Sequence, residues 1–410
     1  MPSNATAAPA PDGRLDEASL LAEARAKTGL RDFGDESFLE PMRRLLWSLE
    51  HEARLTPAGR AGHRTRIVGL LLARLQTNDW LVRHPEIERE PVDVRFVVVG
   101  FPRTGTTLLQ RILARDPRAG SLAWWECRHP APLPGWDPAT ARDVPDPRIE
   151  RAKAEVAGML AFNPALAAQH PLDAMAPDED MMLLEHAFQA SAPCGSNNVP
   201  SYMRWHLLED GIASYRDHAR LLRFLAWQKR MRGEPVGPYV LKAPHHMLHV
   251  DRLLEHFPNA TIVQTHRDLL DTLPSLASLS LELRRLTSDT AHPSECAEYA
   301  LATARARLAG LERVRAATPV KKWIDIWFGD VVAKPLAVVE RIYDRIGLEL
   351  PGPVREEMGR FIAENGRDRR PPHGYTLEQF GLDAASVERE FADYRARYVL
   401  PTIAARRATD

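Results

Sequence analysis

Cysteine is scarce in this sequence, and its scarcity limits the environments and sites that can be expected. The chain of 410 residues has only three cysteines, which lie far apart and form no CxxC pair (Cys127, Cys194 and Cys296). Neither a disulfide framework nor a structural zinc site is therefore predicted. A reducing, cytoplasmic environment fits this cysteine usage.

An excess of one charge and a long apolar run are also lacking. The formal net charge is −1, so there is no overall electrostatic reason to expect binding to nucleic acid or to an anionic membrane. No uninterrupted apolar run reaches about 18 residues, and residues 1–10 have neither the basic start nor the apolar stretch of a signal peptide. We therefore expect no membrane span and no secretion. The abundance of arginine, alanine and proline is typical of GC-rich bacterial genomes.

The chain begins with helical segments that precede the main domain. Residues 1–14 are rich in alanine, proline and glycine, and they are predicted to form a disordered tail. Apolar residues at helical spacing then predict an N-terminal helical extension over residues 15–90. The stretches with this spacing are Ala18–Ala26, Phe38–Leu55 and Ile67–Leu75. The remaining residues, 91–410, are predicted to form one domain.

Four β-branched or apolar runs, each followed by a helical pattern, indicate the fold class of this domain. Strands that alternate with helices predict an α/β fold with a three-layer, P-loop-like parallel sheet flanked by helices. About 130 residues between the first two strands, residues 123–238, read as a helical and loop insertion that shapes the substrate site. A closing helix is expected over Ala384–Ala405. The predicted strands are residues 92–100, 239–242, 260–265 and 321–328.

A glycine- and threonine-rich loop follows the first predicted strand. Residues 100–107 have the spacing GxxxxG[K][ST], but Thr106 occupies the lysine position, and a helix over Leu108–Ala114 follows. Glycines let the backbone wrap an anion, and the helix N-terminus adds a favourable dipole. The missing lysine and the lack of a Walker-B aspartate argue against an ordinary NTPase with magnesium, so no metal is predicted. Arg103 would supply the positive charge, and the alternative is a bare strand-to-helix turn.

A second candidate for anion binding follows the third predicted strand. Arg267 stands at the strand end, and Ser275 follows eight residues later in the next helix. Both side chains can face one anion above the edge of the sheet. Taken alone, this spacing is a weak signal and favours a capped surface turn.

Together the two motifs resemble those of the sulfotransferases that use 3'-phosphoadenosine 5'-phosphosulfate (PAPS). The resemblance is closest to the bacterial branch, although Leu269 replaces a usual proline, and it includes weaker matches such as Tyr394. It implies that Arg267 and Ser275 hold the 3'-phosphate. It also implies that the 5'-phosphate and the sulfuryl group bind to Pro102, Arg103, Thr104, Gly105, Thr106 and Thr107.

This resemblance implies transfer of a sulfuryl group from PAPS, as co-substrate, to a hydroxyl of a small-molecule, lipid or glycoside acceptor. The products would be a sulfate ester and adenosine 3',5'-bisphosphate (PAP), and no metal would be needed. The alternatives are a degenerate P-loop kinase or a nucleotide-binding protein without catalysis. The inserted segment is rich in tryptophan, methionine and other apolar residues, which would line an acceptor pocket or form core. The sequence does not specify the acceptor or the oligomeric state.

The resemblance also suggests catalytic groups. Glu126 stands about where tyrosylprotein sulfotransferases place a glutamate base, and a salt-bridged carboxylate is the alternative. His245 is the second candidate base, and the alternative is that it is a hydrogen-bonded structural histidine. Lys242 would stabilise the leaving oxygen together with Arg103, unless it is an exposed surface lysine. A basic loop with Arg367, Arg369 and Arg370 either closes over the nucleotide, with Arg370 as a ligand, or is a solvated charge run.

Two further clusters leave alternatives open. His245, His246 and His249 include an i, i+4 pair that would suit a metal if it lay on one helix face. The acidic run of residues 178–180 reads as a helix N-terminus whose carboxylates complement the helix dipole, with a substrate-facing role for Glu179 as the alternative.

Overall fold

A four-stranded parallel sheet forms the centre of the chain. The computed structural model describes residues 13–163, 172–365 and 374–407, so all but the last two residues of the predicted N-terminal tail lie outside the described residues. The strand order is β2-β1-β3-β4, and every neighbouring pair is parallel, which confirms the predicted sheet. The strands are β1 (Val94–Gly100), β2 (Tyr239–Lys242), β3 (Thr261–His266) and β4 (Trp323–Trp327).

The parallel register brings the carboxyl ends of the strands to one edge of the sheet. Gly100 at the end of β1 pairs with Thr265 of β3, and Val98 pairs with Lys242 at the end of β2. The loops that follow these strands therefore begin side by side. This is the edge at which open α/β sheets bind their ligands.

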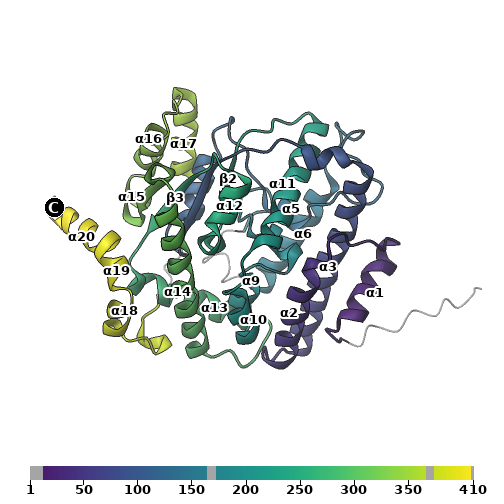
Figure 1. Cartoon of the computed structure of the whole chain (residues 1–410), viewed down its shortest axis with the longest axis horizontal. Helices are drawn as coiled ribbons and strands as arrows, with labels where there is room; N and C mark the ends of the chain where they lie inside the picture. Colours follow the sequence, from purple (N-terminus) through teal and green to yellow (C-terminus); the bar gives the residue numbers. More distant parts are fainter. Residues whose placement is uncertain (1–12, 164–171, 366–373, 408–410) are drawn as a thin grey trace, which may run out of the picture.

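Helices cover both faces of the sheet (Figure 1). Phe96 and Val98 of β1 face one hydrophobic core, whereas Val97 and Val99 face the other. Burial on both faces explains why β1 is a continuous apolar run rather than an alternating one. The first core contains α4 (Thr106–Leu113), α16 (Pro335–Arg345) and α17 (Gly352–Glu364), and the second contains α12 (Val250–His256), α13 (Leu269–Arg284) and α14 (Pro293–Ala317).

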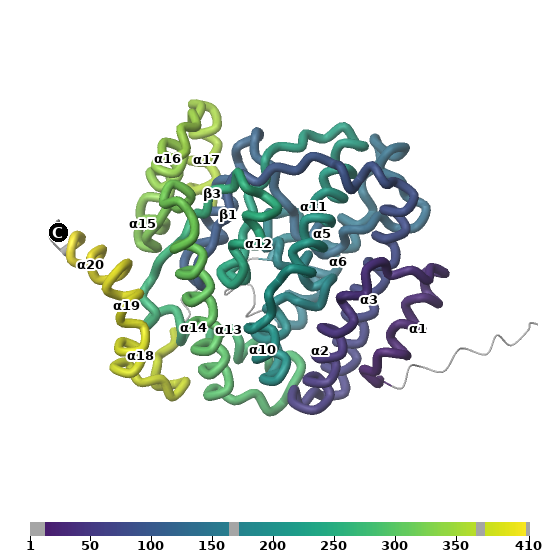
Figure 2. The backbone as a smooth tube through the Cα atoms, in the orientation of Figure 1, coloured from purple at the N-terminus to yellow at the C-terminus, as the bar shows by residue number. Residues whose placement is uncertain are grey.

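The N-terminal helices pack against the inserted segment rather than against the sheet, as the adjacent purple and teal traces of Figure 2 show. The apolar side chains of both regions share one core, and the Tyr202 N–H donates to Ser48 Oγ at 3.0 Å. Thr56 caps the longest of these helices, which has Pro57 in its first turn and extends well beyond the predicted stretch. The helices are α1 (Glu17–Thr28), α2 (Leu39–His51) and α3 (Pro57–Arg83).

The inserted segment is helical, as predicted, and its residues 179 and 180 contact Lys242 at the carboxyl end of β2. Apart from α6, the helices before the long α11 are short and alternate with turns. The α-helices described in it are α5 (Trp124–Arg128), α6 (Pro147–Phe162), α8 (Met181–Leu184), α9 (Ala192–Ser196), α10 (Pro200–His206) and α11 (Ile212–Arg232).

The closing helix predicted over Ala384–Ala405 is present, but it is interrupted at Phe391. The chain leaves helical geometry at Phe391, whose φ and ψ are −107° and 26°, and it then turns so that Phe391 and Tyr394 are buried. Helical propensity alone gives no sign of this break, because the break accompanies the burial of the Phe391 and Tyr394 rings in the core. The pieces are α18 (Ala384–Glu390), α19 (Ala392–Tyr394), a π-helical turn (Arg395–Val399) and α20 (Leu400–Arg407).

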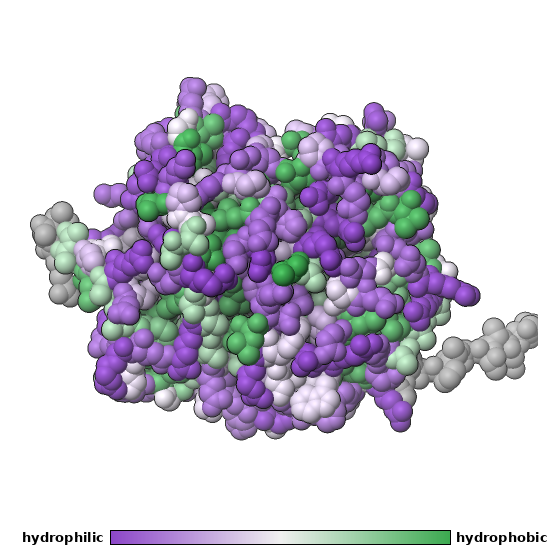
Figure 3. Space-filling view, viewed as in Figure 1, coloured by the Kyte–Doolittle hydropathy of each residue, from purple (hydrophilic) through white to green (hydrophobic). Residues whose placement is uncertain are grey.

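The surface carries no sign of a membrane-spanning element. Within the part of the chain that the structure describes, no helix has both the length and the apolar character to cross a membrane. The face seen in Figure 3 has hydrophilic residues over most of its area, with smaller hydrophobic areas between them.

Candidate active site

The loop after β1 has the curved backbone that an anion requires. Arg103 and Gly105 adopt positive φ angles of 71° and 83°, and α4 begins at Thr106. A side chain on Gly100 could not be accommodated, because its Cβ would lie 2.1 Å from Thr265 Oγ1. Thr104 Oγ1 is hydrogen bonded to Thr265 Oγ1 at 2.6 Å, which ties the loop to β3. Such a curve directs backbone N–H groups toward one point at the helix N-terminus.

Lys242 brings a buried ammonium group to this loop. Its side chain is 0% exposed, and its Nζ donates to Thr107 Oγ1 at 3.2 Å. The alternative of an exposed surface lysine is therefore wrong. Thr107 lies in the first turn of α4, so the cation stands beside the opening of the anion loop.

The second motif contacts the first directly. Arg267 Nη1 donates to the carbonyl oxygen of Arg103 at 3.0 Å, and the guanidinium lies 4.4 Å from the centre of the Phe328 ring. Ser275 is buried on α13, the helix that follows Arg267. The structure therefore brings the two predicted motifs to the same edge of the sheet. Phe328, which begins the helix after β4, was not identified from sequence.

The C-terminal helices brace the turn that carries Arg267. The Tyr394 hydroxyl donates to the carbonyl oxygen of Arg267 at 3.4 Å, and its ring meets Phe101 edge-on at a centroid distance of 6.0 Å. Arg395 forms an ion pair with Asp268 at 3.0 Å. The only sequence signal for this brace was the weak family match at Tyr394.

Two acidic residues of the inserted segment hold Lys242 in place. Glu179 Oε1 lies 2.9 Å from Lys242 Nζ, and Asp180 Oδ1 accepts from the Lys242 backbone N–H at 2.8 Å. The other oxygen of Asp180 accepts from Nε2 of His218 at 2.7 Å and of His246 at 2.9 Å. Asp180 precedes α8, as predicted for a helix N-terminus, but its side chain makes no capping bond. Its contacts to His218 were not foreseen.

The charge state of this buried network follows from its contacts. Burial opposes ionisation of Asp180, but His246 and His218 outweigh it and hold the pKa of the carboxyl well below its usual range. Burial lowers the pKa of His218, and its bond to Asp180 offsets only part of this shift. The ionised carboxylate therefore accepts from an N–H group of each imidazole ring. His246 Nδ1 also lies 2.8 Å from the Tyr215 hydroxyl.

The histidines do not form the metal arrangement that their spacing suggested. His245 and His246 lie in a 3-10 turn (Pro244–Leu248), so His245 and His249 are not stacked on one α-helical face. Within the described ranges, the cluster whose ligand atoms could hold a metal is instead Asp180, His218 and His246. Hydrogen bonds inside that cluster already satisfy the shared carboxylate oxygen.

Glu126 lies inside the inserted segment. Its Oε2 accepts from the Ala123 backbone N–H at 2.8 Å, and its Oε1 pairs with Lys229 Nζ at 3.0 Å. These are the contacts that the described residues give to the carboxylate, whose side chain is 4% exposed. The first bond closes the initial turn of α5.

His245 is buried among other rings. Its Nδ1 lies 2.8 Å from Ser191 Oγ, and its ring centroid lies 5.3 Å from that of His206 and 6.1 Å from that of Tyr215. Burial, assisted by the neighbouring His206, lowers the pKa of His245 well below its usual value. The imidazole is therefore neutral, and its Nε2 has no hydrogen-bond partner among the described residues. Arg367, Arg369 and Arg370 lie outside the described residues.

The apolar residues of the inserted segment divide into two groups. Trp124, Trp125 and Tyr202 are buried, so they form core as the alternative interpretation held. By contrast, Met159, Phe162 and Met175 are exposed large hydrophobic side chains. Met175 stands four residues before Glu179, so part of this apolar surface lies on the segment that reaches Lys242.

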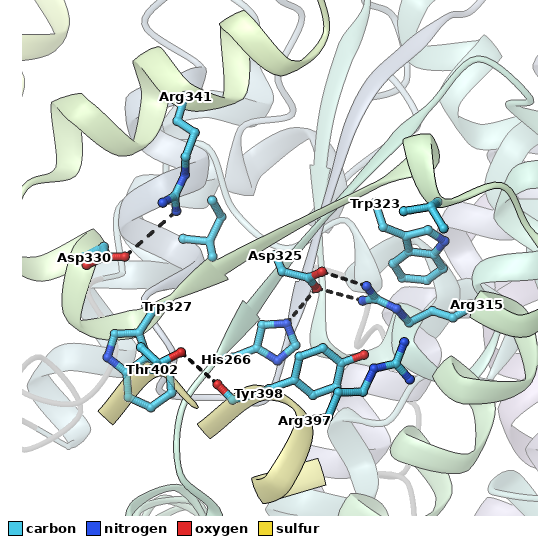
Figure 4. Close-up of a pocket in the computed structure, with 12 residues that line it drawn as sticks. His266, Arg315, Trp323, Asp325, Trp327, Asp330, Arg341, Arg397, Tyr398 and Thr402 are labelled. Carbon is cyan, nitrogen blue, oxygen red and sulfur yellow. Dashed lines mark hydrogen bonds and ion pairs between the residues drawn. The ribbon is translucent and has the colours of Figure 1, made fainter. Parts of the chain in front are cut away.

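A separate hollow of about 510 Å³ lies along β4 and the C-terminal helices (Figure 4). In this hollow, Asp325 binds Arg315 at 2.8 Å and His266 at 2.8 Å. Burial opposes ionisation of Asp325, but these two partners lower the pKa of its carboxyl. The residues that line the hollow include none of the phosphate loop, so we do not assign it to the reaction.

Comparisons with known proteins agree with this geometry. A family model described as "Sulfotransferase family" matches residues 95–352. The crystal structure of sulfotransferase STF1 from Mycobacterium tuberculosis H37Rv is 28% identical with a TM-score of 0.79, and the match covers 92% of this chain and 98% of that one. For sulfotransferase STF9 from Mycobacterium avium the values are 26%, 0.83, 95% and 98%. No curated protein matches the sequence. The matched span includes the phosphate loop, Lys242 and Arg267, and the chain belongs to the sulfotransferase family as an enzyme of the sulfotransferase type.

Proposed function

We propose that the protein transfers the sulfuryl group of PAPS to a hydroxyl of a small-molecule, lipid or glycoside acceptor, giving a sulfate ester and PAP. The observation that carries this proposal is the contact between the two anion motifs, in which Arg267 Nη1 reaches the Arg103 carbonyl oxygen at 3.0 Å. One loop would receive the 5'-phosphosulfate, and the neighbouring turn would receive a second phosphate. A cytoplasmic location is part of the proposal.

The donor would lie across the carboxyl edge of the sheet. Backbone N–H groups of the loop Pro102–Thr107 and the Arg103 side chain would bind the 5'-phosphate and the sulfuryl oxygens. Arg267 and Ser275 would bind the 3'-phosphate, and Arg370, which lies outside the described residues, is the further ligand predicted from sequence. Each anionic group would then face either a cation or a helix N-terminus.

The reaction needs an in-line attack by the acceptor oxygen on sulfur. A bond forms between that oxygen and sulfur, while the bond from sulfur to the 5'-phosphate oxygen breaks and leaves its electron pair on PAP. Lys242, whose Nζ already lies 3.2 Å from Thr107 Oγ1 at the loop, would stabilise the charge that develops on this leaving oxygen. The acceptor proton must pass to a base, for which Glu126 and His245 are the candidates predicted from sequence.

Calorimetric titration with PAP and with AMP tests the donor assignment, because AMP lacks the 3'-phosphate. Wild-type protein should prefer PAP. Arg267→Ala should weaken PAP binding by about 1.5–3 kcal/mol, or roughly 10- to 150-fold, because a charge-assisted pair is lost. Ser275→Ala should cost about 1 kcal/mol, because a neutral hydrogen bond is lost.

Neither substitution should change AMP binding appreciably. Equal losses for PAP and AMP would assign Arg267 to the fold or to the 5'-phosphate. A wild-type protein without preference for PAP would contradict the proposed donor.

A further inference from the structure

We propose that Glu179 is the general base that takes the proton from the acceptor hydroxyl. This inference rests on the proposed function. The starting observation is that the Glu179 carboxylate, at 2.9 Å from Lys242 Nζ, shares the lysine that also contacts Thr107 of the phosphate loop. Only the ammonium group of Lys242 therefore links the Glu179 carboxylate to Thr107 of the phosphate loop in these contacts.

The helix that begins in the phosphate loop also fixes the segment that carries Glu179. Gln110 Nε2 donates to the Asp178 carbonyl oxygen at 2.9 Å, and Arg111 Nε donates to the Pro177 carbonyl oxygen at 3.2 Å. Both donors belong to α4. The loop and the Glu179 carboxylate are therefore held by the same helix. A general base needs such a fixed position relative to the bound donor.

The following residue anchors the segment from the other side. Asp180 is buried and receives the Lys242 backbone N–H, His218 and His246. The Glu179 side chain is 20% exposed, in contrast to 1% for Asp180. The hydrogen bonds of Asp180 are therefore used to hold the fold together. Glu179 remains accessible from the solvent, from which an acceptor hydroxyl would arrive.

The two bases predicted from sequence have less access. The Glu126 side chain is 4% exposed, and its two oxygens are engaged by Ala123 and Lys229. His245 is buried and faces Ser191 and the rings of His206 and Tyr215. Among the described carboxylates, Glu179 is the one that contacts Nζ of the lysine assigned to the leaving group.

In the proposed step, the Glu179 carboxylate accepts the proton of the acceptor hydroxyl as the new oxygen–sulfur bond forms. The electron pair of the breaking sulfur–oxygen bond goes to the 5'-phosphate oxygen, beside Lys242. The protonated Glu179 then releases its proton to solvent. The net change is one sulfate ester, one PAP and one proton from one alcohol and one PAPS, so no further reactant is needed.

The test compares Glu179→Gln with Glu185→Gln. Glutamine keeps the size of the side chain and an oxygen for Lys242 but cannot accept the proton. Glu185 is a matched control, because it lies in the same inserted segment as Glu179, pairs with Arg66 of α3, and has a side chain that is 16% exposed. The probe is ³⁵S-PAPS with a series of phenols from weakly acidic to 4-nitrophenol, assayed at pH 9, and PAP binding is measured for each variant.

Glu179→Gln should lower the transfer rate to weakly acidic phenols by about 10²- to 10⁴-fold, with PAP binding unchanged within about threefold. The loss should shrink to less than about threefold with 4-nitrophenol, which is already ionised at this pH and needs no base. Glu185→Gln should behave like the wild type. A glutamate that only positions Lys242 would give equal losses for every phenol.

Three results would overturn the inference: equal losses across the phenols, retention of full activity in Glu179→Gln, or the expected pattern in Glu126→Gln or His245→Ala instead. Failure of the donor assignment is recognised separately, because wild-type protein would then show no preference for PAP over AMP.

Discussion

Two largely buried lysine–glutamate pairs of nearly the same length lie in very different places among the described residues. Lys242 and Glu179 lie 2.9 Å apart where the sheet meets the inserted segment, whereas Lys229 and Glu126 lie 3.0 Å apart within that segment. Lys242 also contacts the phosphate loop, but Lys229 donates to the Ser121 carbonyl oxygen. The same chemical pair therefore occurs both at the proposed reaction site and inside the inserted segment, and the elements that it joins distinguish the two.

Removing each lysine gives the strongest test of this difference. Lys242→Met should lower the transfer rate by about 10²- to 10³-fold, because charge on the leaving oxygen loses its nearest buried cation. Transfer from ³⁵S-PAPS at saturating donor measures the effect, and Lys229→Met is the matched control that should keep the rate. An equal loss in a stably folded Lys229→Met protein would remove the distinction between the pairs.

Acidification should destabilise the inserted segment and its surroundings first. Burial lowers the pKa of His206 and of His186 to about 3, and that of His249 to about 4. In the unfolded chain these histidines bind protons near pH 6.5, whereas in the fold they bind them only near pH 3–4. The free energy of unfolding should therefore be highest above pH 6.5 and fall as the pH drops toward 4. The slope should approach about 1.4 kcal/mol per pH unit for each histidine.

Urea unfolding between pH 7.5 and 4.5 measures this dependence, and His206→Gln should reduce the slope. A stability that stays constant across this range would show that these imidazoles are not held neutral in the fold.

The Lys229–Glu126 pair should matter for stability instead of rate. Lys229→Met leaves the Glu126 carboxylate buried without its cation, and we expect a loss of about 2 kcal/mol, below the range for fully buried pairs because Lys229 is partly exposed. Chemical denaturation measures this loss. Lys153→Met is the control, since its pair with Glu150 is exposed and should contribute less than about 0.5 kcal/mol. A similar cost for both variants would contradict a structural role for the inner pair.

Chelation should have the smallest effect. The transfer rate in EDTA should stay within about twofold of the untreated value, because sulfuryl transfer as proposed takes its positive charge from Lys242 and arginine. A loss that one particular metal restores would direct attention to Asp180, His218 and His246, the described cluster whose ligand atoms lie within 4.8 Å of one another.

Much of the fold and part of the site could be predicted because their signals are local. The four strands end at or within two residues of the predicted positions, since β-branched runs that stop at a glycine or a charged residue are a short-range pattern. The phosphate loop occupies eight consecutive residues. Its glycine, threonine and arginine residues serve the backbone curvature of the loop itself, so the loop can be recognised without knowledge of the rest of the fold. The break in the closing helix was missed because it depends on where Phe391 and Tyr394 are buried.

The sequence alone determined the family, the four strands and their alternation with helices, the loop of residues 100–107, and the positions of Arg267 at a strand end and of Ser275 in the next helix, because each is a local pattern of the chain. Only the tertiary structure decided which carboxylate meets which lysine. The contact between Lys242 and Glu179 spans 63 residues, and that between Thr104 and Thr265 spans 161. Lys242 and Glu179 meet only after the inserted segment has packed against α4 and β2, and Thr104 and Thr265 meet only after β1 has paired with β3. No periodicity in the sequence records either event.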